Sequence, residues 1–272
     1  MSYYTLPPID PIIMSLGPIS IRWYGLMYVI GFFATYFLVR QQIQRHQFTQ
    51  LEKNFDNLNT VLILCVILGG RLGYVVFYNL SYYLQHPLEI LATWHGGMSF
   101  HGACIALILG GLIFCKIKKI DFWATADVYV ATIPIGLGLG RIGNLINGEL
   151  YGRVTEQPWG IIFPNGGPLP RHASQLYESL LEGLILFIIL WSLRNRPWKR
   201  NSLTPHGTIL SLFLCLYGLF RIIIENFRQP DPQLGFIVAH ITMGQLLSGA
   251  MILCGLTLWF WRIHQKKRAT AL

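Results

Sequence analysis

The chain has 272 residues, of which 53% are hydrophobic and only 12% are charged. Soluble domains carry about 25% charged residues, so this composition excludes an ordinary soluble domain and indicates an integral membrane protein. The formal net charge of +9 would suit a nucleic-acid-binding protein, but the positions of the basic residues argue against that class.

Seven apolar stretches are long enough to cross a bilayer as helices, which takes about 20 mostly apolar residues. In chain order they cover residues 19–39, 57–78, 97–115, 123–146, 174–193, 206–227 and 241–261. The fourth and sixth are included despite their polar content. The sequence therefore predicts an all-α, polytopic membrane protein that forms one integral membrane domain over residues 1–272.

The basic residues are concentrated in every second connection between these helices and in the C-terminal tail. The connections after the first, third and fifth helices and the tail after the seventh hold fourteen of the 21 Lys and Arg residues, including all seven lysines. Cytoplasmic loops are enriched in Lys and Arg, so we expect a periplasmic N-terminus and a cytoplasmic C-terminus. The loops near 79–96 and 147–173 are then periplasmic. The positive charge becomes mostly a topology signal, and we expect no nucleic-acid partner.

Three arginines lie at membrane depth in the predicted helices: Arg71, Arg141 and Arg221. A charge at membrane depth is costly and is a functional-site hypothesis by default; a structural arginine bonded to backbone carbonyls is the alternative. At 1.5 Å per residue, all three lie in the periplasmic half, Arg71 roughly 10 Å deep. Polar residues of other helices reach the same layer, namely Tyr24, His101, His172, Gln175 and Glu178. This convergence favours one shared site.

The sixth predicted helix carries a polar stripe. Its members are Tyr217, Arg221, Glu225 and Arg228, spaced by four, four and three residues, so they share one helical face. We expect Arg221 and Glu225 to pair, because an unpaired charge at this depth is costly. The stripe has a surplus of positive charge and predicts an anionic ligand. Arginine suits phosphate through its planar fork, and a phospholipid headgroup is the simplest anion in this layer.

The segment from Gly140 to Gly152 combines Arg141 and Asn144, three residues apart on one helical face, with Glu149. Possible proton-transfer groups are His101 and the carboxylates Glu149, Glu178 and Glu225. The sequence contains neither an HExxH metal pair nor a GxSxG nucleophile turn. We therefore expect no metal site and no enzyme serine nucleophile.

Several segments match, in order, the motifs of one family. They are Ile21–Gly25, Gly70–Tyr74, Gly96–Gly102, the signature Gly140–Gly152, Arg171–Glu178 and Arg221–Asp231. Together they resemble the prolipoprotein diacylglyceryl transferases of bacterial inner membranes. Leu145 departs mildly from the signature, since an aromatic residue is common there. The resemblance covers nearly the whole chain, and the thirteen-residue signature is its most specific part.

The resemblance implies a reaction and its partners. A diacylglyceryl group moves from phosphatidylglycerol, in the lipid bilayer, to the thiol of the lipobox cysteine in a prolipoprotein peptide. A thioether forms and glycerol phosphate leaves, with no metal or organic cofactor. The family also implies seven spanning helices and an active site on the periplasmic side of the inner membrane.

The family reaction gives each candidate residue an expected role. His101 is the expected base for the substrate thiol, and Arg141 and Arg221 are expected to stabilise charge on the leaving phosphate. Asn144, Glu149 and Gly152 are expected to shape the pocket, while Tyr24 and Arg71 hold the lipid. The other expected substrate-binding residues belong to the sixth helix, namely Tyr217, Glu225 and Arg228.

Two other function classes compete with this interpretation. A transporter or flippase for an anionic lipid or solute would also need arginines at membrane depth, but the sequence lacks the inverted repeats and interrupted helices typical of that class. A purely structural scaffold does not explain the costly arginines.

Overall fold

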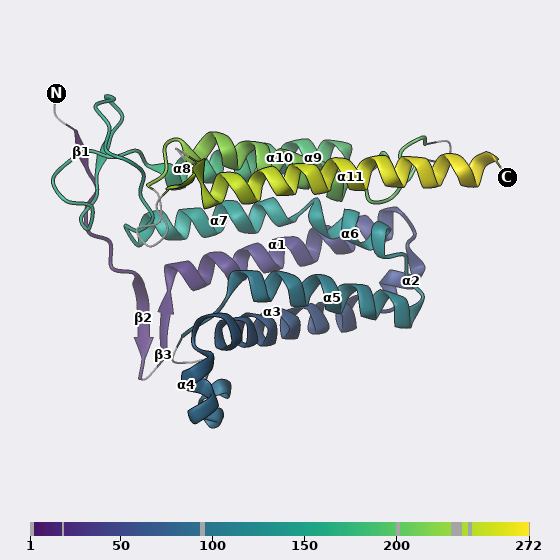
Figure 1. Cartoon of the computed structure of the whole chain (residues 1–272), viewed down its shortest axis with the longest axis horizontal. Coiled ribbons are helices and arrows are strands. Elements are labelled where there is room, and N and C mark those ends of the chain that lie inside the picture. Colours follow the sequence, from purple (N-terminus) through teal and green to yellow (C-terminus); the bar gives the residue numbers. More distant parts are fainter. Residues whose placement is uncertain are drawn as a thin grey trace. The chain divides into compact units, whose positions relative to one another are not determined.

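The computed structural model describes residues 3–17, 19–92, 96–199, 202–229, 236–238 and 241–271. The chain divides into two compact units. The first unit comprises residues 1–42 and 126–272, and the second comprises residues 43–125. Most of the described chain is helical, as expected (Figure 1).

The seven predicted membrane-spanning segments are confirmed. Within the described residues, seven helices have the length and hydropathy to cross a membrane. They cover Trp23–Arg45, Phe55–Tyr78, Phe100–Lys118, Phe122–Ile146, Ser174–Leu193, Thr208–Glu225 and Met243–Ala269. The fifth segment has the predicted limits, and the others differ from the prediction at one or both ends, most at the end of the seventh, which extends to Ala269 where 261 was predicted.

The first unit begins with short strands that the sequence analysis did not predict. Strand β2 (Ile12–Leu16) pairs antiparallel with β3 (Ile19–Arg22), which leads directly into helix α1 (Trp23–Arg45). The alternation of apolar and polar residues over 19–22 is typical of a strand, so the predicted first helix began four residues too early. Strand β1 (Tyr4–Thr5) pairs with β4 (Ile161–Ile162) and ties the N-terminus to the 147–173 loop.

The fourth spanning segment consists of two helices, α6 (Phe122–Val130) and α7 (Ile133–Ile146). Pro134 lies in the first turn of α7, where its missing N–H costs no helical hydrogen bond. The buried Thr132 at the junction donates its hydroxyl to the carbonyl of Tyr129 at 2.7 Å. The proline thus explains why a new helix starts here. Arg141 lies towards the C-terminal end of this helix.

The fifth spanning segment is also irregular. It comprises α8 (Ser174–Glu178), the π-helical segment η3 (Ser179–Ile185) and α9 (Leu186–Leu193). Short π-helical stretches are frequent at functional sites. Helix α7 approaches η3 closely where Gly138 faces Gly183, since a Cβ on Gly138 would lie only 3.1 Å from the Cα of Gly183. This approach brings the polar residues of the two segments within reach of one another.

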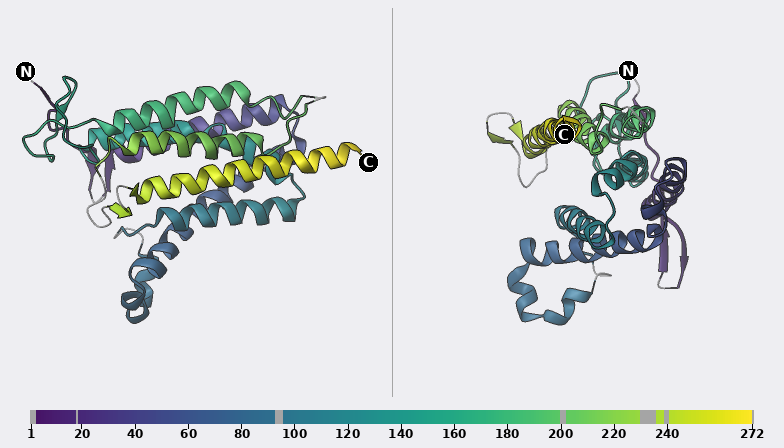
Figure 2. Two further views of the ribbon diagram at one scale, coloured as in Figure 1. Left: turned by 45° about the horizontal axis from the view of Figure 1, so that its top comes forward. Right: turned by 90° about the vertical axis from the view of Figure 1, so that its right-hand side faces the viewer.

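Helices α10 (Thr208–Glu225) and α11 (Met243–Ala271) complete the first unit and run side by side (Figures 1 and 2). Asp127 of α6 stabilises the start of α10, because its carboxylate accepts hydrogen bonds from the backbone N–H groups of Gly207 and Leu210 at 2.8 and 2.9 Å. A core cluster packs α6, α9 and α10 together and includes Val130, Ala131, Leu186, Leu190 and Ile209. These contacts hold α10, with Arg221 near its C-terminal end, against its neighbours.

The second unit is built on α3 (Phe55–Tyr78) and α5 (Phe100–Lys118), which pack along their lengths. The short helix α2 (Thr49–Glu52) precedes α3. The expected loop at 79–96 is largely helical, with α4 (Leu80–Gln85) and the 3₁₀ helix η1 (Pro87–Leu91). Residues 93–95 of that loop lie outside the described residues.

Candidate active site

Two of the expected catalytic arginines meet at one buried carboxylate. Glu178, at the end of α8, is fully buried, and its Oε2 lies 2.6 Å from Nε of Arg141 and 3.1 Å from Nη1 of Arg221. Arg141 comes from α7 and Arg221 from α10, so three separate helical segments contribute to this contact. The expectation that the two arginines lie close together is therefore supported by direct geometry.

Three further charged residues extend this contact into a cluster. Nη1 of Arg221 lies 3.6 Å from Oε1 of Glu182, and its Nε lies 3.4 Å from Oε2 of Glu225. The second of these contacts confirms the expected pairing of Arg221 with Glu225. Nη1 of Arg228 lies 4.0 Å from Oε2 of Glu178. Burial lowers the pKa of the Arg228 guanidinium from its ordinary value, and the positive charge of Arg221 lowers it further.

The charge of the cluster differs from the expectation. The polar stripe of the sixth helix, taken alone, has a surplus of positive charge. The cluster, however, pairs three arginines with three glutamates, Glu178, Glu182 and Glu225. Glu182 was not predicted, although it follows Glu178 by four residues and so shares its helical face. Glu178 was predicted to lie in the polar layer and to be a possible proton-transfer group. Its ion pairs with Arg141 and Arg221 were not predicted, because an ion pair between distant segments leaves no trace in local spacing.

Exposure distinguishes the two kinds of side chain in this cluster. The Arg141, Arg221 and Arg228 side chains are 22%, 14% and 13% exposed, whereas the three carboxylate side chains are at most 7% exposed. The guanidinium groups are therefore more accessible than the carboxylates that contact them. Charge-assisted contacts to the buried carboxylates hold the guanidinium groups in place.

The end of α7 contributes a second set of contacts. Asn144 lies near Arg141, with its Oδ1 3.5 Å from the arginine Nη1, and donates its amide to Oε1 of Glu149 at 3.0 Å. The same Glu149 oxygen accepts from Asn147 at 3.0 Å, and the Glu149 carbonyl accepts from buried Gln175 at 2.7 Å. The structure thus brings Asn144 and Glu149 together beside Arg141. Their expected role in shaping the pocket stays a prediction.

Tyr24 and Tyr217 occupy flanking positions. Tyr24, near the start of α1, packs against Gly143 of α7, and its hydroxyl lies 3.0 Å from that of Tyr28. Tyr217 precedes Arg221 by one turn of α10 and stacks on Phe213 with ring centroids 5.6 Å apart. The expected contact of either tyrosine with lipid stays a prediction.

Gly152 is placed where a side chain has no room. Its N–H donates to the carbonyl of His172 at 2.8 Å, and it forms a bridge with Arg228. A Cβ at this position would collide with the carbonyl oxygen of Phe227 and would lie 2.8 Å from Cβ of His172. His172 packs against Phe227 with ring centroids 5.2 Å apart, and burial lowers the pKa of its imidazole. Gly152 therefore joins the 147–173 loop to the end of α10.

Arg71 belongs to the second unit, where backbone carbonyls take up its guanidinium group. Its Nε donates to the carbonyl of Ile90 at 2.8 Å, Nη2 donates to that of Glu89 at 2.7 Å, and Nη1 donates to those of Gly96 and Gly97 at 2.6 and 3.2 Å. The residue is 4% exposed. These contacts show a structural role, in which Arg71 fixes the segment after α4. Its expected role in lipid binding stays a prediction.

His101 also belongs to the second unit. It is the second residue of α5 and its side chain is exposed, two residues after the N-cap Ser99, whose Oγ accepts the N–H of Gly102 at 3.2 Å. The expectation that His101 acts beside Arg141 and Arg221, which belong to the first unit, stays a prediction.

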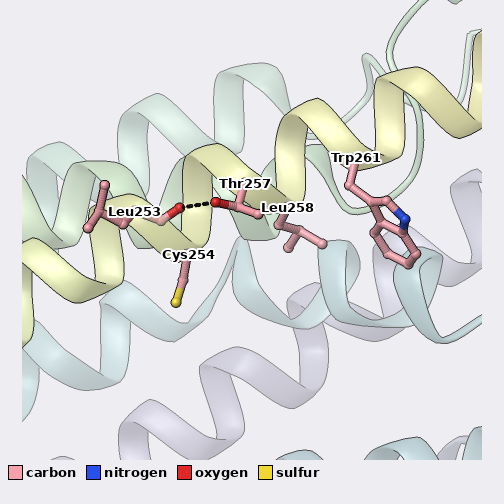
Figure 3. Close-up of a pocket in the computed structure, with 5 residues that line it drawn as sticks. All are labelled: Leu253, Cys254, Thr257, Leu258 and Trp261. Atoms are coloured by element: carbon pink, nitrogen blue, oxygen red, sulfur yellow. Dashed lines mark hydrogen bonds between the residues drawn. The ribbon is translucent and has the colours of Figure 1, made fainter.

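A pocket on α11 offers a different kind of surface (Figure 3). It is lined by Leu253, Cys254, Thr257, Leu258 and Trp261. The one hydroxyl among them, on Thr257, donates to the carbonyl of Leu253 at 2.8 Å. The pocket contains none of the expected site residues, and its surface suits apolar chains rather than a charged headgroup.

Comparison with known proteins agrees with the motifs. Residues 11–261 match the family model of prolipoprotein diacylglyceryl transferases. A phosphatidylglycerol–prolipoprotein diacylglyceryl transferase of Geobacter sulfurreducens is 52% identical over 252 residues, which cover 93% of this chain and 95% of the relative. The enzyme of that name from Pasteurella multocida is 50% identical over 259 residues, covering 93% and 92% of the two chains. The chain therefore belongs to the prolipoprotein diacylglyceryl transferase family.

Proposed function

We propose that this protein transfers the diacylglyceryl group of phosphatidylglycerol to the lipobox cysteine of a prolipoprotein, the first step of lipoprotein maturation. The observation that carries the proposal is the convergence of Arg141 and Arg221, from different helices, on Glu178. Relatives of about 50% identity that bear this activity in their names support it over nearly the whole chain.

The reaction exchanges one bond at a glyceryl carbon. The cysteine sulfur forms a thioether bond to the glyceryl CH₂ carbon, and the bond from that carbon to the phosphate oxygen breaks. The bonding electrons remain on the oxygen, which leaves as part of glycerol phosphate, and the thiol proton passes to a base. Thiols ionise poorly at neutral pH, so the reaction needs help both at the sulfur and at the leaving oxygen.

The arginines assist the leaving group in this proposal. Arg141 and Arg221 bind the phosphate of the lipid, with Arg228 nearby, and stabilise the negative charge that grows on the oxygen. Glu178 holds both guanidinium groups from behind. Asn144 and Glu149 form the wall of the pocket on the α7 side. The substrate supplies the nucleophile, so no enzyme cysteine takes part.

His101 is proposed as the base for the thiol. Replacement by glutamine keeps hydrogen-bonding capacity but removes the base, and general base catalysis is worth about 10²–10⁴-fold. We therefore expect His101→Gln to lower kcat within that range and to alter the pH profile of transfer. Near-normal turnover over a broad pH range would exclude this role and would leave Glu149 and Glu225 as the next candidates.

The site is proposed to open towards the periplasm, in a multi-pass protein of the inner membrane with a periplasmic N-terminus and a cytoplasmic C-terminus. The basic connections at 116–119 and 194–200 support this orientation. In a cysteine-free background, single cysteines at the exposed positions Ser81, Asn165 and Ser192 provide the test. An impermeant thiol reagent should label the first two in cells with a permeable outer membrane, and the third only after lysis. Labelling of Ser192→Cys but not Asn165→Cys in intact cells would invert the topology.

Mass spectrometry tests the activity itself. A lipobox peptide incubated with the purified protein and phosphatidylglycerol should gain the mass of one diacylglyceryl group on its cysteine. A cysteine-to-serine peptide is the matched control and should remain unmodified. Lipid movement between vesicle leaflets without any peptide adduct would instead support the transporter class.

A further inference from the structure

The N-terminus of α11 lies against the carboxylate of Glu225. Oγ1 of Thr242, the residue just before α11, donates to Oε1 of Glu225 at 3.1 Å. Thr242 is 3% exposed and Glu225 is 6% exposed, so water does not compete for this hydrogen bond. Glu225 in turn contacts Nε of Arg221 at 3.4 Å. A continuous set of contacts therefore runs from the start of α11 to an arginine of the proposed phosphate site.

The direction of the Thr242 hydrogen bond follows from the capping of the helix. The backbone N–H of Gln245 donates to Oγ1 of Thr242 at 3.2 Å, and the backbone N–H of Thr242 donates to Oε1 of Gln245 at 3.2 Å. This is a capping box, in which the first and fourth residues satisfy each other's backbone donors. Because an N–H can only donate, the Thr242 hydroxyl proton is available for Glu225. Glu225 is therefore the acceptor, as an ionised partner of Arg221 must be.

Gly244 makes room for the carboxylate. It is the second residue of α11, and a Cβ built on it would lie 2.9 Å from Cδ and from both carboxylate oxygens of Glu225. A methyl group at this position would force the carboxylate to move. The first turn of a helix also favours nearby negative charge, because its backbone N–H groups lack helical partners.

We propose that Thr242 and Gly244 are positioning residues that hold Glu225 and, through it, the Arg221 guanidinium in the orientation needed for transfer. This inference rests on the proposed function. Neither residue belongs to the motifs that led to the site, and neither contacts Arg221 in the charge cluster. Their effect on catalysis passes through Glu225, so it should fall on kcat more than on the KM for phosphatidylglycerol, since Arg221 acts as charge develops.

The first test compares valine and serine at position 242. Thr242→Val keeps the shape but loses the hydroxyl, whereas Thr242→Ser keeps the hydroxyl that donates to Glu225 and caps α11. Removing a hydrogen bond to a charged group costs enough free energy to lower a rate or equilibrium constant about tenfold or more. We expect Thr242→Val to lower kcat by that factor per folded enzyme, and Thr242→Ser to recover most of the rate.

The second test uses two glycines of the same helix. Gly244→Ala places a methyl group against the Glu225 carboxylate, while Gly249→Ala places one where no atom lies within 4 Å. Alanine favours helix over glycine at both positions, so neither change weakens α11 through its propensity. We expect Gly244→Ala to lower kcat about tenfold or more, as the loss of the hydrogen bond would, and Gly249→Ala to match the wild type.

The outcomes separate this inference from the proposed function. A wild-type protein that forms no peptide adduct would refute both. A wild-type protein that is active while folded Thr242→Val and Gly244→Ala keep its kcat would refute the positioning role alone. If Thr242→Val fails to fold, Gly244→Ala decides the question, because its helix is not weakened. Equal losses in Gly244→Ala and Gly249→Ala would also refute it.

Discussion

Replacing Arg141 or Arg221 by lysine should abolish most transfer while leaving the protein folded. Lysine keeps the positive charge but loses the planar fork that binds two oxygens at once. It also loses the Nε donor by which Arg141 reaches Glu178 at 2.6 Å and Arg221 reaches Glu225 at 3.4 Å. Loss of a donor that stabilises developing charge typically costs about 10²–10³ in kcat, and we expect a loss of that order for each variant.

The measurement is steady-state transfer to a lipobox peptide with the lipid concentration varied in nanodiscs. The loss should fall on kcat more than on KM, because the arginines act most strongly as charge develops on the leaving oxygen. Arg196→Lys, on the basic connection after α9, is the matched control for the substitution itself. Wild-type rates in both Arg141→Lys and Arg221→Lys, with unchanged stability, would show that the proposed site is wrong.

Removing the charge of Glu178 should have the second large effect. Glu178→Gln keeps the side-chain volume but leaves Arg141 and Arg221 without the buried carboxylate that both contact. Removing one partner of a buried ion pair costs about 3–5 kcal/mol. We expect the variant to unfold at lower temperature in detergent and to lose most activity even where it remains folded, because the two guanidinium groups are no longer held together.

Glu182→Gln is the matched control for Glu178→Gln. Both residues lie on the same helical face and are almost fully buried. Glu182, however, meets Arg221 only at 3.6 Å, and its Oε1 accepts no hydrogen bond from the described residues. Its replacement should therefore cost much less stability and activity. Equal effects of the two substitutions would contradict the central position given to Glu178.

The parts of this protein that follow from local spacing were predictable from its sequence. Hydropathy predicted seven spanning helices, and the i,i+4 spacing predicted the contact of Arg221 with Glu225. The depth of Arg141 and Arg221 correctly suggested that they lie near each other. The first two features follow from the hydropathy and the residue spacing of single segments, and the third from counting residues along two predicted helices.

Contacts between distant segments were not predictable in the same way. Glu178 joins helices far apart in the chain, and nothing in the spacing around it indicates which arginines it meets. Arg71 was grouped with the site because of its depth, yet its donors are satisfied by carbonyls of the segment that follows α4. An arginine that binds a ligand and one that orders a loop have the same cost in the membrane, so only the contacts distinguish them.

The proposed reaction breaks the bond between the glyceryl carbon and the phosphate oxygen, and that oxygen leaves as part of glycerol phosphate. Phosphatidylglycerol that carries ¹⁸O between the diacylglyceryl carbon and phosphorus tests this most directly. Mass spectrometry of both products should find all of the label in glycerol phosphate and none in the peptide adduct, with one glycerol phosphate released per adduct. Label retained in the lipidated peptide, or release of glycerol phosphate without an adduct, would contradict this reaction.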